Sequence, residues 1–221
     1  MRKERLVDLA YEHVKQLLLD GLARADERFS IDDIASTLAM SRQPVMDAMK
    51  RLAQEGFVEI VPQVGCRVKS ARVEEIDDFF RLFAAGEGLI AELAATRAQG
   101  DDVLKLKLIS AQIGALSSLN GDIKVRGTAY RRLNRQFHAE MRRIARSPVT
   151  ASIVESLGDR SDFYIAQSEQ PVFGGHVEAA HAEHEAIITA IEQSDAAAAR
   201  AACESHIVAA EGRLLTHPTK D

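Results

Sequence analysis

The sequence predicts a mainly α-helical protein of two domains, and three observations support this. Strand signals occur only near the start of the chain, whereas apolar residues recur at helical spacing through the rest. A length of 221 residues suits one large or two small domains. The net charge of −5 is unevenly spread, because residues 1–70 carry equal numbers of basic and acidic side chains. We therefore expect one domain at 1–70 and a second, acidic domain at 71–221.

The first part of the chain is predicted to form three helices. Apolar residues at helical spacing between positions 6 and 18 indicate the first helix. Ser30, followed three residues later by Asp33, resembles a capping box and is expected to begin a short second helix. Ser41 is expected to cap a third helix over 42–55, which the following glycine ends.

Two short segments of alternating hydrophobicity follow the third helix, at 57–61 and 66–69. The residues between them, 62–65, are typical of a turn, so the two segments are expected to pair as a hairpin. This order of helices and strands is that of a winged helix-turn-helix, whose last helix enters the DNA major groove while its wing contacts the backbone or minor groove. The sequence therefore predicts a DNA-binding domain, although the whole chain has a net charge of −5.

The predicted DNA-reading helix exposes polar side chains opposite its apolar face of Val45, Met49 and Leu52. Arginine can reach guanine edges or phosphates, glutamine can read adenine, and serine and lysine can hold phosphates. Such side chains on a surface are often merely solvated, but here they form an ordered set with two basic residues of the wing. The candidate DNA-binding residues are Ser41, Arg42, Gln43, Met46, Lys50, Arg67 and Lys69.

From residue 73 onward the sequence predicts a bundle of six to seven helices. The six that we delimit cover 73–97, 102–119, 127–145, 149–167, 176–193 and 195–215. The sequence contains neither a signal-peptide core nor a run of about 18 apolar residues for a membrane span. The two distant cysteines, Cys66 and Cys203, build neither a disulfide framework nor a zinc-thiolate cluster. We expect a cytoplasmic protein.

Three histidines are expected to converge inside this bundle. His184 lies 10 residues before Ser194 and His206 lies 12 after it, so an antiparallel hairpin turning there brings both imidazoles to nearly the same level. Asn134 and His138 share one face of an earlier helix, since they are four residues apart. Imidazoles beside a side-chain oxygen suit a divalent transition metal such as zinc, nickel or manganese. The alternative is that each histidine is a hydrogen-bonded core residue.

The segment at 41–58 reads SRQPVMDAMKRLAQEGFV and resembles the S-R-T-P-V-R-E-A-L-x-R-L-x-x-E-G-L-V signature of GntR-type bacterial transcription regulators. Flanking residues, Ile34 to Leu38 and Gly65 to Val68, match the family's second helix and wing. The resemblance implies a regulator that binds DNA through a winged helix. Met46 stands where the family usually has arginine, and the loss of that charge-assisted contact implies a different affinity or operator sequence.

The helical part resembles the FCD ligand-sensing domain of the FadR subfamily, with its pattern of D-x-x-x-H, E-H-x-x-I-x-x-A-I and A-x-x-H-I/L. The matching segments read NRQFH at 134–138, EHEAIITAI at 183–191 and CESHI at 203–207. The metal ligands that the resemblance implies are Asn134, His138, His184 and His206. Asn134 replaces the usual aspartate and brings no charge, so we expect the metal to be held less tightly. Candidate effector contacts are Arg131, Arg135 and His181.

Together these observations predict a homodimeric repressor, or less often an activator, that binds palindromic double-stranded operator DNA. A small metabolite of carboxylate type is expected to control its affinity from a metal-containing pocket. A metal-independent organic effector held by Arg and His is the alternative. A metal-dependent hydrolase is less favoured, because Ile188 takes the place of the second histidine that H-E-x-x-H would require after His184. The sequence also has no nucleophile elbow and no Gly-rich phosphate loop, so we expect no enzyme.

Overall fold

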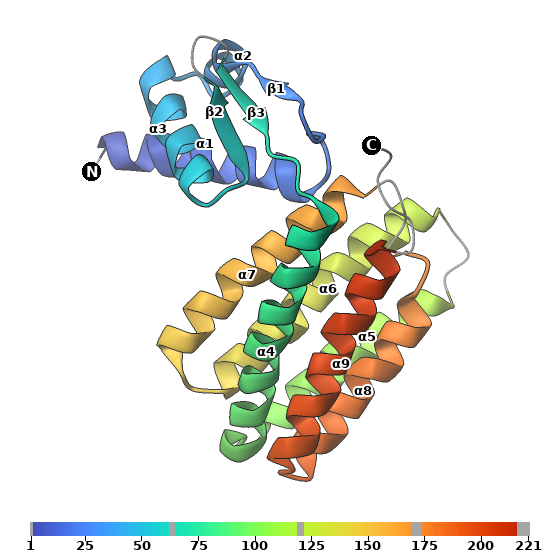
Figure 1. Ribbon diagram of the computed structural model, residues 1–221. Coiled ribbons are helices and arrows are strands. Elements are labelled where there is room, and N and C mark those ends of the chain that lie inside the picture. Colours follow the sequence, from blue (N-terminus) through green and yellow to red (C-terminus); the bar gives the residue numbers. More distant parts are fainter. Residues whose placement is uncertain (1, 62–64, 119–121, 169–173, 216–221) are drawn as a thin grey trace. The chain divides into compact units, whose positions relative to one another are not determined.

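The computed structural model describes residues 2–61, 65–118, 122–168 and 174–215 (Figure 1). The chain forms two compact units, Met1–Arg72 with Asp162–Gln167 and Val73–Ser161 with Ser168–Asp221. The first unit thus includes the end of a helix that the sequence analysis assigns to the C-terminal domain. The reason is packing, because the buried ring of Phe163 meets Phe57 edge to face at 5.3 Å in the core of the first unit.

The first unit has three complete helices and a small sheet in its described residues. They are α1 (Arg2–Leu19), β1 (Arg28–Phe29), α2 (Ile31–Thr37), α3 (Arg42–Gln54), β2 (Val58–Val61) and β3 (Gly65–Val68). All strand pairs are antiparallel, in the order β1-β3-β2. The sequence analysis did not anticipate β1, which has only two residues and depends on pairing with Cys66 and Arg67 of β3.

Local capping explains where the helices of this unit begin and end. The backbone N–H of Asp33 donates to the Ser30 hydroxyl at 3.2 Å, which confirms the predicted start of α2. Ser41 occupies the N-cap position of α3, although its side chain makes no capping hydrogen bond in the described structure. Gly56 adopts a φ of 74°, a backbone conformation that favours glycine and ends α3. Within the predicted turn at 62–65, residues 62–64 lie outside the described residues.

The second unit is helical throughout its described residues. Its elements are α4 (Val73–Arg97), α5 (Asp102–Ser117), α6 (Ile123–Ile144), α7 (Pro148–Gln167) up to residue 161, α8 (Val177–Glu192) and α9 (Ala196–Leu215). Helices α8 and α9 pack as a hairpin through Ser194, and α4 packs along α9 (Figure 1). Helix α6 begins four residues earlier than predicted, because the Asp122 carboxylate accepts the N–H of Lys124 at 2.8 Å and caps it.

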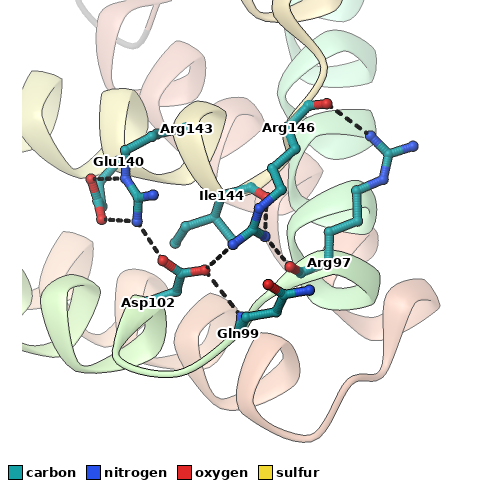
Figure 2. A network of polar contacts seen from close by, with 7 residues as sticks. All are labelled: Arg97, Gln99, Asp102, Glu140, Arg143, Ile144 and Arg146. Atoms are coloured by element: carbon teal, nitrogen blue, oxygen red, sulfur yellow. Dashed lines mark hydrogen bonds and ion pairs between the residues drawn. The ribbon is translucent and has the colours of Figure 1, made fainter.

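A polar network joins the ends of three helices in this unit (Figure 2). Asp102, at the start of α5, accepts hydrogen bonds from Arg143 at 2.5 Å, in the last turn of α6, and from Arg146 at 2.8 Å, just after that helix. Arg97, at the end of α4, donates to the carbonyl of Ala145 at 2.7 Å. Hydrogen bonding from Arg143 lowers the pKa of Asp102 to about 2. The network therefore anchors the C-terminal end of α6, the helix that carries His138.

Candidate functional site

Helix α3 presents a polar edge opposite its buried residues. Ser41, Arg42, Gln43 and Lys50 are exposed, as the sequence analysis expected. Met46 differs, because it is partly buried and packs against the core of its unit. Its side chain is therefore shared between the core and the polar edge, and only part of it is available to a ligand of that edge.

The polar groups of this edge are paired with acidic side chains of the same unit. The Nε of Arg42 lies 3.2 Å from the Asp32 carboxylate on α2. Asp47 accepts hydrogen bonds from Gln43 at 3.0 Å and from Lys50 at 3.2 Å. Because the Arg42, Asp32 and Lys50 side chains are more than half exposed, their ion pairs add little stability, and the cations can exchange carboxylates for phosphates.

The wing carries the other two candidate DNA contacts. Arg67 and Lys69 are exposed, whereas the residue before each of them, Cys66 and Val68 respectively, is buried. Strand alternation explains this pattern. Arg67 pairs with Glu59 on the neighbouring strand and lies 3.7 Å from the carboxylate of Asp26. The wing thus continues the pattern of solvent-exposed arginine held by acidic neighbours.

Three histidines meet inside the second unit, from three different helices. His138 of α6, His184 of α8 and His206 of α9 each offer one ring nitrogen within 4.8 Å of the others. The rings of His184 and His206 are 4.5 Å apart between centroids, which confirms that the α8–α9 hairpin brings them to one level. All three side chains are buried. The ring of Phe137 stacks on His184 at 4.3 Å and fixes its position.

A buried carboxylate orients His138. Its Nδ1 lies 3.1 Å from Oε2 of Glu87, a residue of α4 that has no exposed surface. Arg142, one turn after His138, donates to the other oxygen of Glu87 at 2.9 Å. Burial alone would raise the pKa of Glu87, but His138 and Arg142 outweigh it and lower that pKa. With Nδ1 donating to a carboxylate, Nε2 is the nitrogen that His138 has left for a metal.

A second carboxylate orients His206 in the same way. Its Nδ1 lies 2.7 Å from Oε2 of Glu183, and the other oxygen of Glu183 accepts from Arg213. Burial lowers the pKa of His206, and the nearby Glu183 only partly opposes this. The imidazole is therefore held mainly in its neutral form, with Nε2 as the nitrogen left for a ligand.

His184 differs from the other two histidines because no carboxylate in the described part of the chain orients it. Both of its ring nitrogens are buried without a hydrogen-bond partner among the described residues. Burial lowers the pKa of His184 well below its ordinary value, and the neighbouring His206 and His138 add to this. A neutral imidazole between two other imidazoles, with a nitrogen that nothing satisfies, fits a divalent transition metal. The residues present therefore suit the metal that the sequence analysis proposes.

The fourth proposed ligand lies one turn from His138 on α6. Asn134 is partly exposed, and its Oδ1 accepts a hydrogen bond from the Tyr130 hydroxyl at 3.3 Å. A single carbonyl oxygen has two lone pairs, so this contact leaves it one for a cation.

The three candidate effector residues have different surroundings. Arg131 shares the α6 face of Asn134 and is partly buried, whereas Arg135 is exposed and pairs with Asp159 of α7 at 2.9 Å. The Nδ1 of His181 lies 3.1 Å from the Ser110 hydroxyl of α5, and this histidine is not part of the three-histidine group.

Comparison with known families decides what these two units are. The FCD domain family matches residues 78–209, and the family described as bacterial regulatory proteins, gntR family, matches residues 6–68. The chain belongs to the GntR family and carries an FCD domain. Both matches lie where the sequence analysis placed the corresponding resemblances, so the predicted winged helix followed by a helical FCD domain is confirmed.

Three curated relatives are HTH-type transcriptional regulators. YdhC of Bacillus subtilis is 22% identical over 69% of this chain, and a regulator of Agrobacterium vitis is 29% identical over 40% of it. The repressor GlaR of Escherichia coli is 29% identical over 45% of this chain. The alignments span 66%, 52% and 47% of these relatives' own lengths, so about half to two thirds of each is matched.

Two solved structures have a similar fold over almost the whole chain. McbR/YncC of E. coli has a TM-score of 0.77 at 18% identity, covering 96% of this chain and 97% of that one. A regulator of the GntR type from Rhodococcus sp. RHA1 has a TM-score of 0.74 at 18% identity, covering 99% of both chains. At this identity the likeness concerns the fold alone.

Sequence reasoning missed the four residues that orient the histidines of the FCD domain. They are Glu87, Arg142, Glu183 and Arg213. Glu183 directly precedes His184, so its place beside the cluster was visible in the motif. Glu87 lies 51 residues from His138 on another helix, and no spacing in the sequence links the two.

Proposed function

We propose that this protein is a DNA-binding transcriptional regulator, a repressor rather than an enzyme, that acts in the cytoplasm. Its winged helix would read an operator through α3 and the β2–β3 wing, with two copies of the chain on the two half-sites of a palindrome. The exposed cations of α3 and the wing support this. The E. coli relative GlaR is named as a transcriptional repressor, and we extend repression to this chain as part of the proposal. No helix in the described residues is long and apolar enough to cross a membrane.

The FCD domain would sense a small carboxylate together with a divalent metal. The observation that carries this is His184, whose two buried nitrogens lack a partner in the described structure while two other imidazoles converge on it. His138, His184 and His206 would hold the metal, with Asn134 as a neutral fourth ligand. When bound, the metal supplies a positive charge and open coordination positions.

Charge in this region favours an anionic effector. Histidine and asparagine bring no negative charge to a metal, and the nearby Glu87 and Glu183 are each paired with an arginine, Arg142 and Arg213 respectively. A divalent cation would therefore bring positive charge that these two carboxylates, already paired, do not fully offset. A metabolite carboxylate would offset it, with Arg131 beside it on the face of α6. The candidate contacts Arg135 and His181 would take part only if they left Asp159 and Ser110.

A thermal-shift screen tests the sensing half of this proposal. Protein purified without a histidine tag is stripped with a chelator and mixed with a panel of organic acids, with and without Zn²⁺, Ni²⁺ or Mn²⁺. We expect one metal to raise the melting temperature and an acid to raise it further by about 5 °C or more, but only when the metal is present. An acid that stabilises the stripped protein equally would favour the metal-independent effector. A protein that no metal stabilises would contradict the histidine site.

A further inference from the structure

Asp47 lies in the middle of the polar edge of α3, among the candidate DNA-binding residues, but carries a negative charge. Its carboxylate Oδ1 accepts from Gln43, one turn earlier, and from Lys50, nearly one turn later. The three side chains follow one stripe of the helix, since they are spaced by four and three residues. The Asp47 side chain is 26% exposed and that of Lys50 is 57% exposed, so the carboxylate is accessible to a ligand but less exposed than its cationic partner.

In the absence of DNA, the polar side chains of this edge are paired with carboxylates of the protein itself. The Gln43 amide and the Lys50 ammonium both point to the same carboxylate. Arg42 is matched by Asp32 in the same manner. Each cation of the edge thus has a negative charge within 3.2 Å, and the attraction of the edge for phosphates of arbitrary sequence is reduced. Binding has to exchange these contacts for contacts with DNA.

The carboxylate itself discriminates among bases in the major groove. A carboxylate only accepts hydrogen bonds, and cytosine's own major-groove edge offers an amino group and no acceptor. Adenine also offers an amino group, but its N7 acceptor lies beside it and faces the carboxylate with like polarity. Guanine and thymine present acceptors. When Gln43 and Lys50 turn to the DNA, Asp47 loses the hydrogen bonds that it accepts from them. Among the four bases, cytosine is the one that can replace them with a hydrogen bond from its amino group.

We propose that Asp47 is a specificity-determining residue of the reading helix. It holds Gln43 and Lys50 in the free protein, accepts the amino group of a cytosine in each operator half-site, and penalises other sequences by leaving a carboxylate unpaired in the groove. The inference rests on the proposed reading of DNA by α3. The basic residues of the edge bind phosphates as readily as bases, so they select a sequence only in part. Asp47 would supply the remaining selectivity.

The test compares the full-length protein with D47A and D47N by selection from a library of random duplexes. The control is D8A, which removes another exposed ion pair of the same unit, that of Asp8 on α1 with Arg51 on α3. We expect the wild-type protein and D8A to enrich one palindromic sequence with a cytosine at a fixed position of each half-site. D47A and D47N should enrich the same sequence with any base at that position.

Binding of a random-sequence duplex, measured against salt, gives the second readout. Freeing Lys50 for a phosphate should make D47A bind this duplex about tenfold more tightly, with a salt dependence steeper by about 0.9 in log–log slope per protomer. If D47A keeps the cytosine preference and the wild-type affinity for random DNA, the role of Asp47 is wrong while DNA reading by α3 stands. If the wild-type protein enriches no sequence, the proposed function itself fails.

Discussion

Replacing His206 with glutamine is expected to lower the affinity of the FCD domain for Zn²⁺ by at least about 100-fold. The change removes one of three imidazoles, and loss of even an outer partner of a metal ligand costs 10-fold to 100-fold in affinity. Glutamine keeps most of the side-chain volume in this buried position, so the helix packing should survive. Competition against a chelator of known affinity, with protein purified without a histidine tag, measures the effect.

The control for this experiment is His176→Gln. His176 is exposed at the start of α8 and lies outside the three-histidine group. The His176→Gln protein should bind Zn²⁺ with the affinity of the wild-type protein. Circular dichroism of both variants reports on folding. A folded His206→Gln protein with wild-type affinity would show that the metal, if bound, is held elsewhere.

Replacing Arg42 with alanine is expected to weaken binding to the selected operator by about 100-fold. Arg42 is exposed at the first turn of α3, where recognition helices contact base edges and phosphates. A dimer loses the contact twice, and each good contact of this kind is worth about 1–3 kcal/mol. Fluorescence anisotropy with a labelled operator duplex at fixed salt concentration measures the loss.

Arg5→Ala serves as the charge-matched control, since Arg5 is exposed on α1. Its effect should stay within a few-fold at the same salt concentration, because a remote surface charge acts only through screened attraction. Arg42→Ala with unchanged operator affinity and an intact fold would overturn the assignment of α3 as the reading helix.

Helix-level features could be predicted from the sequence because they depend on local patterns. The Ser30 cap, the end of α3 at its glycine and the convergence of His184 with His206 all follow from short-range spacing and the rise of a helix. Strand β1 could not be predicted in this way, because two residues carry no alternation and pair only through β3. Likewise, α6 begins at Ile123, earlier than predicted, because the Asp122 carboxylate caps the helix there although the sequence pattern favours a helix less strongly.

The surroundings of the candidate sites depend on tertiary contacts that no spacing reveals. Glu87 on α4 contacts His138 on α6, and Asp32 on α2 contacts Arg42 on α3. Met46 lies at the border between the apolar and polar faces of α3, so its position on the helix did not show that it packs against the core. The ligand types were thus predictable from the residues, but the partners that orient and neutralise them were not.

The central claim is that occupancy of the FCD domain controls operator affinity. It is tested most directly by measuring the dissociation constant of the selected operator with metal-loaded protein, with and without the acid found by thermal shift. We expect the dissociation constant to change by about 5-fold to 150-fold on adding the acid, the usual range of coupling between two sites, and not to change in His206→Gln. The same dissociation constant with and without the acid in the metal-loaded wild-type protein would contradict it.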